Sequence, residues 1–156
     1  MIEIRRATIE DETEIFNLLG QLIPAENSPD SPVRSESGFN MFRKIINNEE
    51  KGTIIVAEEE NTVVGIITLS YPTAIRCGGT YALIEEFIVS ETMRGKGVGG
   101  KLLATVIDEA SSRNCYEVQV NRPSEMGYPL YIRYGWQDLG KHLNMSLSGK
   151  REEGTQ

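Results

Sequence analysis

Residues 89–110 read VSETMRGKGVGGKLLATVIDEA, a glycine-rich loop that runs directly into an amphipathic helix. The segment before the loop, Thr80–Val89, is mostly apolar and rich in β-branched residues, which indicates a central strand. A glycine-rich loop that opens a helix usually holds a phosphate, because the free N–H groups and the positive end of the helix meet there. The stretch therefore predicts an α/β fold with a phosphate-binding loop.

Three phosphate-binding motifs overlap on this loop and imply different proteins. Residues 95–100 fit the dinucleotide fingerprint G-x-G-x-x-G, with Glu117 at about the right distance for a ribose carboxylate. Only 39 residues follow Glu117, however, and a doubly wound domain needs several more strand–helix units. The P-loop alternative requires a serine or threonine for the magnesium ion where this chain has Leu102. The sequence disfavours both motifs.

The third interpretation includes the arginine before the loop. Residues 94–99 fit R/Q-x-x-G-x-G/A, which resembles the acyl-CoA pyrophosphate loop of the GNAT family of N-acetyltransferases. The segment VVGIITL (63–69) resembles the family's third strand, and PLYIRYGW (129–136) matches its L-Y-x-x-x-G-F pattern, with Trp136 in place of phenylalanine. The order of predicted elements also matches, so the resemblance covers residues 2–147.

Periodicity and turn residues predict one α/β domain over residues 1–147, followed by a frayed tail over 148–156, in the order β-α-α-β-β-β-α-β-α-β. The resemblance implies the GNAT fold, a mixed, mostly antiparallel sheet of six to seven strands flanked by about four helices. The predicted segments are a strand at Ile2–Thr8, a helix after a Thr8/Asp11 capping box, a mobile loop at Pro24–Gly38, a helix at Phe39–Asn48, a hairpin at Thr53–Tyr71, strands at Thr80–Val89 and Cys115–Asn121, the helix after the glycine loop, a short helix that stops at Gly135, and a strand at Trp136–Leu147.

The family resemblance implies where acetyl-CoA would bind. Main-chain groups at the end of the strand would contact the acetyl and pantetheine moieties, and the N–H near Val89 would polarise the thioester carbonyl. The loop would hold the pyrophosphate, and Ser124 stands where many members have an asparagine that touches the coenzyme. The candidate coenzyme contacts are Phe87, Ile88, Val89, Arg94, Gly95, Lys96, Gly97, Val98, Gly99, Gly100 and Ser124.

Transfer of an acetyl group to an amine also needs an acid for the leaving thiolate and a way to deprotonate the amine. By resemblance, Tyr131 is the acid that protonates the thiolate of coenzyme A, and a phenol stays neutral at pH 7. A competing interpretation is that Tyr128, Tyr131 and Tyr134, spaced by three, form an aromatic stripe in the core.

The base is less constrained by the sequence. Glu85 and Glu86 are adjacent acids in an otherwise apolar strand, where alternation sends them to opposite faces. The stretch IEEFIVSETMRGKGVG is similar to that of polyamine acetyltransferases, in which the first acid activates the amine, so the resemblance points to Glu85. Glu86 and the absence of any side-chain base are alternatives, and many relatives place the base on another strand, where this chain has Gln119.

Composition limits the partners. Sixteen basic and 23 acidic residues give a net charge of −7, which argues against nucleic acid. No apolar run approaches the ~18 residues of a membrane span, and one histidine and two cysteines without metal spacing disfavour a metal site. We therefore expect a cytoplasmic, metal-free N-acetyltransferase that moves the acetyl group of acetyl-CoA directly to a primary amine of a small molecule. A protein amine as acceptor, a non-catalytic acyl-CoA-binding or regulatory domain, and a homodimer remain open.

Overall fold

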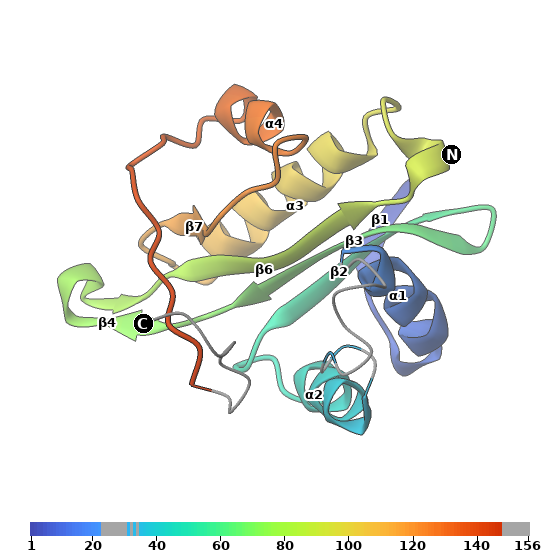
Figure 1. Ribbon diagram of the computed structural model, residues 1–156, viewed down its shortest axis with the longest axis horizontal. Coiled ribbons are helices and arrows are strands. Elements are labelled where there is room, and N and C mark those ends of the chain that lie inside the picture. Colours follow the sequence, from blue (N-terminus) through green and yellow to red (C-terminus); the bar gives the residue numbers. More distant parts are fainter. Residues whose placement is uncertain (23–30, 32, 34, 148–156) are drawn as a thin grey trace, which may run out of the picture.

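The computed structural model describes residues 1–22, 31, 33 and 35–147. Five strands form a central sheet in the order β1-β2-β3-β6-β7, in which only the β6–β7 pair is parallel, and two more strands form a separate ribbon (Figure 1). The elements are β1 (Glu3–Arg6), α1 (Glu12–Leu19), α2 (Glu36–Ile46), β2 (Thr53–Glu59), β3 (Thr62–Ser70), β4 (Thr73–Ala74), β5 (Gly79–Thr80), β6 (Ala82–Val89), α3 (Val98–Ser112), β7 (Val118–Val120) and α4 (Tyr128–Arg133).

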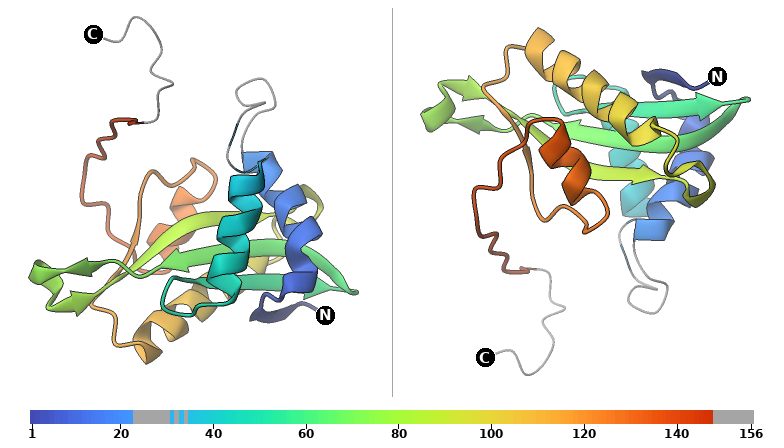
Figure 2. Two further views of the ribbon diagram at one scale, coloured as in Figure 1. Left: turned by 90° about the horizontal axis from the view of Figure 1, so that it is seen from below. Right: turned by 90° about the horizontal axis from the view of Figure 1, so that it is seen from above.

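The sheet is buried on both faces by helices, as Figure 2 shows. On one face, Ile15 of α1 and Phe42 of α2 pack against Ile54 and Ile66 of the sheet. On the other face lie α3 and α4, and the apolar stripe predicted for α3 is the buried side of that helix. The expected α/β class and GNAT fold are confirmed, with the predicted hairpin present as β2 and β3.

Two boundaries of the predicted helices are confirmed by local geometry. At the first, the expected Thr8/Asp11 capping box is present, with the backbone N–H of Thr8 donating to the Asp11 carboxylate (2.8 Å), and it opens the 3-10 turn Ile9–Asp11 that leads into α1. At the second, Gly135 follows α4 with φ of +101°, a left-handed conformation that glycine adopts easily. A short stretch of sequence therefore determines where the first helical segment begins and where α4 ends.

The last predicted strand is wrong. Residues 137–147 are exposed and form no strand, although Leu143, Met145 and Leu147 alternate with polar residues as in a strand. Alternation shows only that one side would be apolar, and a strand also needs an adjacent edge to pair with. The central sheet consequently has five strands among the described residues, and β4 and β5 pair only with each other.

Two other predicted segments are shorter or differently placed than expected. The strand predicted at Cys115–Asn121 is a strand only over Val118–Val120. Most of the predicted loop at Pro24–Gly38 lies outside the described residues, as does the predicted tail at 148–156. The last residues of that loop already belong to α2, because Ser35 occupies the N-cap position and the helix begins at Glu36.

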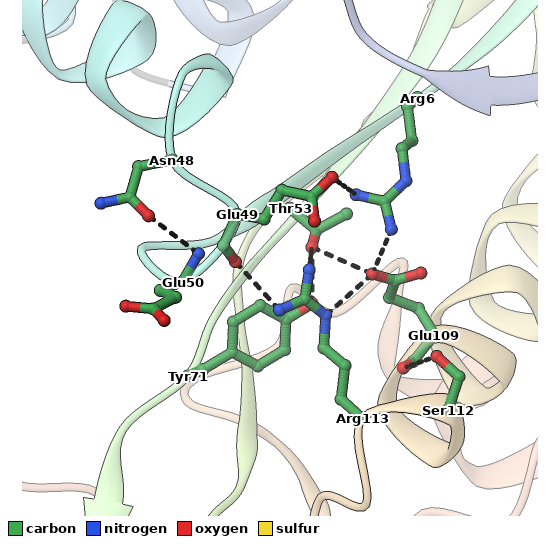
Figure 3. A network of polar contacts seen from close by, with 9 residues as sticks. All are labelled: Arg6, Asn48, Glu49, Glu50, Thr53, Tyr71, Glu109, Ser112 and Arg113. Atoms are coloured by element: carbon green, nitrogen blue, oxygen red, sulfur yellow. Dashed lines mark hydrogen bonds and ion pairs between the residues drawn. The ribbon is translucent and has the colours of Figure 1, made fainter.

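A polar network holds the C-terminal end of α3 on the sheet (Figure 3). The Glu109 carboxylate accepts from Arg113 (2.9 Å) and from Arg6 of β1 (2.7 Å). The Arg113 guanidinium lies 4.3 Å from the centre of the Tyr71 ring, and the Tyr71 hydroxyl is 2.6 Å from that of Thr53 on β2. These contacts join β1 and β2 to α3 at the end opposite the glycine loop.

Candidate active site

The site begins where two neighbouring strands separate. Strands β6 and β7 pair only over Ala82–Ile84 and Val118–Val120, and β6 then continues to Val89 with β3 as its single partner. Beyond Val120 the chain leaves the sheet toward α4 (Figure 1). The last residues of β6 therefore present an unpaired edge, and main-chain N–H and C=O groups along it are available to a ligand.

A β-bulge in β6 determines which side chains face this opening. Thr68 of β3 is opposite Glu86, whereas Leu69 is opposite Ile84, so Glu85 is the extra residue. An extra residue shifts the alternation by one position. As a result Phe87, like Ile84 before the bulge, packs on the α3 side of the sheet.

The main-chain groups of β6 alternate between β3 and the opening. The N–H of Ser90 donates to Val64 of β3 (2.8 Å), so the groups of Val89 point to the other edge, where its carbonyl accepts from Arg94 Nε (3.2 Å). The same alternation directs the groups of Phe87 to the opening and those of Ile88 to β3. Of the three expected main-chain contacts, the geometry thus favours Phe87 and Val89, while Ile88 lines the cavity described below without offering its main chain.

The first part of the glycine loop needs glycine for its backbone conformation. Gly95 and Gly97 have φ of +78° and +83°, and a Cβ on either would meet nothing within 4 Å. Gly97 is the N-cap of α3, whose first hydrogen bond runs from the N–H of Lys101 to the Gly97 carbonyl (3.2 Å). The preceding helical N–H groups have no partner within the helix, and such groups form an anion-binding site.

The last two glycines of the loop have a different role. A Cβ on Gly99 would lie 2.9 Å from Leu130 of α4, and a Cβ on Gly100 would collide with the Tyr134 hydroxyl. Both residues lie in the first turn of α3. Their missing side chains allow α4 to pack closely on α3, so this part of the motif also encodes helix packing.

The open edge, the loop and α4 enclose a cavity of about 540 Å³. Ten of the eleven residues expected to bind the coenzyme line it, the exception being Lys96, which is exposed in the loop. The sequence interpretation missed seven lining residues, which are Gln21, Leu22, Met93, Met126, Gly127, Leu130 and Arg133. No sequence motif marks these residues as a group. Leu130 and Arg133 do lie within the segment PLYIRYGW (129–136), which matches the L-Y-x-x-x-G-F pattern. The lining residues include two arginines and no carboxylate, which suits an anionic ligand.

Tyr131 lies behind the cavity wall and not among its lining residues. Its ring packs edge-on against Phe87 (5.9 Å between centroids) and Trp136 (5.5 Å), and only 4% of the residue is exposed. Its hydroxyl has no hydrogen-bond partner among the described residues, and burial raises the pKa of the phenol. Tyr131 is therefore a core residue, as the aromatic-stripe interpretation expects, yet one with an unpaired hydroxyl beside the open edge of β6.

The other two tyrosines of the motif, Tyr128 and Tyr134, are partly exposed. Of the three rings in the expected aromatic stripe, Tyr131 alone is therefore buried. Tyr128 donates to the Asp138 carboxylate (3.0 Å), and the hydroxyl of Tyr134 lies against Gly100. Trp136 also belongs to this cluster, and its indole N–H is buried without a hydrogen-bond partner among the described residues. Buried unpaired polar groups are rare and often mark functional sites.

The two acids of β6 have different environments. Glu85 is exposed at the bulge and is not a lining residue of the cavity. Glu86 is half-buried, with its carboxylate bonded to the Thr68 hydroxyl, which in turn accepts from the Glu86 backbone N–H (3.0 Å). Burial raises the pKa of Glu86 and the neighbouring Glu85 charge adds to this, while the Thr68 hydrogen bond offsets part of it. Gln119 on β7 donates to the Glu117 carboxylate (2.6 Å).

Two kinds of feature are absent from the described residues. They contain no group of three or more histidine, cysteine, aspartate or glutamate residues that could hold a metal ion. None of the helices in residues 1–22 and 35–147 is long and apolar enough to cross a membrane.

Comparison with known proteins identifies the family of the chain. The model of the acetyltransferase (GNAT) family matches residues 14–136. Glucosamine 6-phosphate N-acetyltransferase 1 of Oryza sativa subsp. japonica is 27% identical over 150 residues, which cover 92% of this chain and 85% of the relative. Aminoalkylphosphonate N-acetyltransferase of Salmonella typhimurium is 25% identical, covering 86% of this chain and 84% of the relative.

Solved structures share the architecture. A predicted acetyltransferase from Clostridium acetobutylicum, crystallised with acetyl-CoA, superimposes with a TM-score of 0.78 at 25% identity. The match covers 94% of this chain and 97% of that protein. The likeness thus extends over nearly the whole chain.

Proposed function

The chain belongs to the acetyltransferase (GNAT) family, and from this we propose that it moves the acetyl group of acetyl-CoA directly to the primary amine of a small molecule. The observation that carries the proposal is the unpaired edge of β6 beside the N-terminus of α3. A long ligand with a pyrophosphate at one end and an amide-containing arm at the other matches this arrangement. The pyrophosphate would take the helix N–H groups, and the arm would pair with the edge.

The proposal assigns roles to a few groups in and beside the cavity. Arg94, tethered to the Val89 carbonyl, and Arg133, which has no partner among the described residues, would bind phosphate oxygens of the coenzyme. The main-chain N–H of Phe87 or Val89 would donate to the thioester oxygen as charge develops on it. The unpaired hydroxyl of Tyr131 would give its proton to the departing thiolate, and Glu85 would accept a proton from the amine.

Two relatives suggest the acceptor class. Their names describe N-acetylation of glucosamine 6-phosphate and of aminoalkylphosphonates, which are small amines that carry a phosphorus acid. We therefore place such amines first among the acceptors to be tested, ahead of polyamines and of protein amines.

The test is an acceptor screen in which released thiol and acetylated amine are both measured. Each phosphorus-bearing amine is paired with its uncharged-tail analogue: glucosamine 6-phosphate with glucosamine, and aminoethylphosphonate with ethanolamine. Spermidine and a lysine-containing peptide represent the other classes. We expect stoichiometric thiol and acetylamine with at least one small amine, and higher kcat/KM for the phosphorus-bearing member of its pair.

Binding is measured separately from turnover. Acetyl-CoA should raise the melting temperature, because a ligand that binds only the native state stabilises it, whereas ATP and NAD should do little. A shift with acetyl-CoA but no acetylated amine would favour a non-catalytic acyl-CoA-binding domain. A larger shift with NAD would contradict the proposal.

A further inference from the structure

Trp136 is the single tryptophan of the chain, and its side chain carries a polar group that the proposed reaction leaves without a role. The indole N–H is buried without a hydrogen-bond partner among the described residues. A buried donor without an acceptor costs free energy, because folding removes it from water and supplies nothing in return. A group of this kind calls for an explanation in terms of function.

The backbone at the end of α4 holds Trp136 beside Tyr131. After the helix, the N–H of Gly135 donates to the Ile132 carbonyl (3.1 Å), and the N–H of Trp136 donates to the Tyr131 carbonyl (3.0 Å). With Gly135 at positive φ, these two hydrogen bonds form a Schellman motif, in which the residue after the glycine commonly packs on the last turn of the helix. The two rings meet edge-on, with 5.5 Å between their centres. The end of the helix thus fixes this contact.

Tyr131 carries the acceptor atom that the indole lacks. The residue is buried, and its hydroxyl has no hydrogen-bond partner among the described residues. Its ring lies against those of Phe87 and Trp136, and the phenylalanine side chain has no polar atom. Trp136 is not a lining residue of the cavity, so its N–H is not directed to a ligand bound there. Of the two neighbouring rings, only the indole can donate a hydrogen bond to the phenol oxygen.

The proposed reaction places a negative charge on that oxygen. As the amine nitrogen bonds to the carbonyl carbon and the C–S bond breaks, the thiolate sulfur takes the proton of the Tyr131 hydroxyl, which gives a thiol and a phenolate. Burial disfavours the phenolate and raises the pKa of Tyr131, and no charged side chain of the described residues contributes to that pKa. A neutral donor is therefore needed, and a hydrogen bond to an ionised oxygen is stronger than one between neutral groups.

We propose that Trp136 is a positioning residue for Tyr131, and that its indole N–H donates a hydrogen bond to the Tyr131 oxygen as the phenol gives up its proton. The phenolate then regains a proton from solvent before the next turnover. The pattern L-Y-x-x-x-G-F has phenylalanine at this position, so the N–H is particular to this chain. The inference rests on the proposed role of Tyr131 as the acid, although the hydrogen bond itself is measurable without turnover.

A matched replacement removes the N–H and keeps the shape of the side chain. Because Trp136 is the only tryptophan, an analogue supplied during expression changes this position alone. Benzothienylalanine has the bicyclic ring system of tryptophan with sulfur in place of the N–H. We expect kcat to fall about tenfold with an unchanged KM for acetyl-CoA, since the lost hydrogen bond forms only as the charge develops. The melting temperature should not fall, because the analogue buries no unpaired donor.

A second substitution shows whether Trp136 acts through the Tyr131 oxygen. In a Tyr131→Phe background that oxygen is absent, so the analogue should cause no further loss of kcat. Trp136→Phe provides the genetic counterpart, with the residue of the L-Y-x-x-x-G-F pattern, and should show the same dependence on Tyr131. An equal loss of kcat with and without the oxygen would mean that Trp136 acts through packing, and would overturn the inference.

Ionisation of Tyr131 provides a measurement that needs neither acceptor nor turnover. Difluorotyrosine ionises at lower pH than tyrosine, so in a chain that contains it the phenols can be titrated by fluorine NMR while the protein stays folded. The resonance of position 131 is the one missing from Tyr131→Phe. In Trp136→Phe this position should ionise about one pH unit higher, while Tyr81, which lies against Arg76, should titrate as in the parent.

The outcomes separate this inference from the proposed function. An unchanged titration of position 131 in Trp136→Phe would overturn the inference alone, whatever the turnover of the parent. Turnover of Tyr131→Phe within about twofold of the parent would remove Tyr131 as the acid, and the catalytic role of Trp136 with it. A titration shift together with a kcat loss that depends on the Tyr131 oxygen would support both.

Discussion

Ile84 and Val120 are the last residues through which β6 and β7 pair. One residue further on, the bulge at Glu85 shifts the side chains of β6, and the groups of Phe87 and Val89 are directed to the opening instead of to a neighbouring strand. Parallel strands that separate in this way leave part of one edge unpaired but surrounded by protein. The site therefore consists largely of backbone, and its geometry depends on where the pairing ends.

The first prediction concerns the backbone of the glycine loop. Gly97→Ala should lower the free energy of unfolding by about 1–2 kcal/mol, because alanine is strained at φ of +83°. It should also weaken acetyl-CoA binding in a thermal-shift titration. The matched control is Gly78→Ala, also at positive φ (+64°) and with open space around its Cβ, but outside the cavity lining. That variant should lose similar stability and keep its affinity, and equal affinity losses in both would contradict a phosphate-binding role for Gly97.

The second prediction separates catalysis from packing at Tyr131. Tyr131→Phe keeps the ring between Phe87 and Trp136 and removes a hydroxyl that has no partner among the described residues, so stability should change little. If the hydroxyl is the general acid, kcat should fall by about 10²–10⁴-fold while the KM for acetyl-CoA stays near its original value. Steady-state kinetics on the folded variant provides the measurement, and turnover within about twofold of the parent would leave Tyr131 a core residue only.

The third prediction distinguishes the two acids of β6 by their pH profiles. If Glu85 is the base, Glu85→Gln should reduce the rate most at low pH, where the amine is protonated, and the deficit should shrink at high pH. Glu86→Gln is the matched substitution on the neighbouring residue. A profile in which only Glu86→Gln shows this dependence would transfer the role to Glu86, and two unchanged profiles would favour solvent as the proton acceptor.

The fourth prediction concerns how the raised pKa of Glu86 makes the free energy of unfolding depend on pH. A carboxyl whose pKa is higher in the folded state holds its proton more tightly there, so stability falls as the pH rises above the unfolded pKa of about 4.5. Glu86→Gln replaces the carboxyl by an amide that does not ionise, so the variant does not lose this stability as the pH rises. Chemical denaturation should show the variant gaining stability relative to the parent between pH 4 and pH 7, and a constant difference across this range would mean that the carboxyl is not destabilised by burial.

The fifth prediction concerns Glu109. Its pKa is lowered in the folded state, so its contribution to stability depends on pH in the direction opposite to that of Glu86. Burial opposes ionisation of this carboxyl, but the Arg113 hydrogen bond and the charges of Arg6 and Arg113 outweigh it and lower the pKa. The ion pairs therefore stabilise the fold above the unfolded pKa, and their contribution is lost as the pH falls through the folded value. Glu109→Gln should cost about 1–3 kcal/mol at pH 7, and the cost should shrink at acid pH in denaturation measurements.

Several features of the site could be predicted because they are local. The glycines of the loop, the arginine before them and the L-Y-x-x-x-G-W stretch are close in sequence, and each stretch forms one turn or one helix. The apolar stripe of α3 follows from a 3.6-residue period in the same way. Strand Trp136–Leu147 was predicted by equally local evidence and is wrong, since its alternation carries no information about a pairing partner.

The sequence by itself determined the class of fold, the glycine-rich loop before α3 and the segments that border the cavity, because conformational preference and periodicity act over a few residues. Only the tertiary structure decided where β6 and β7 separate, that Glu85 is a bulge, that Gly99 and Gly100 serve the packing of α4, and that Tyr131 is buried behind Phe87. Those features depend on strand register and on contacts between elements far apart in the chain. A one-residue shift in register exchanges the two faces of a strand, so no local pattern could have specified them.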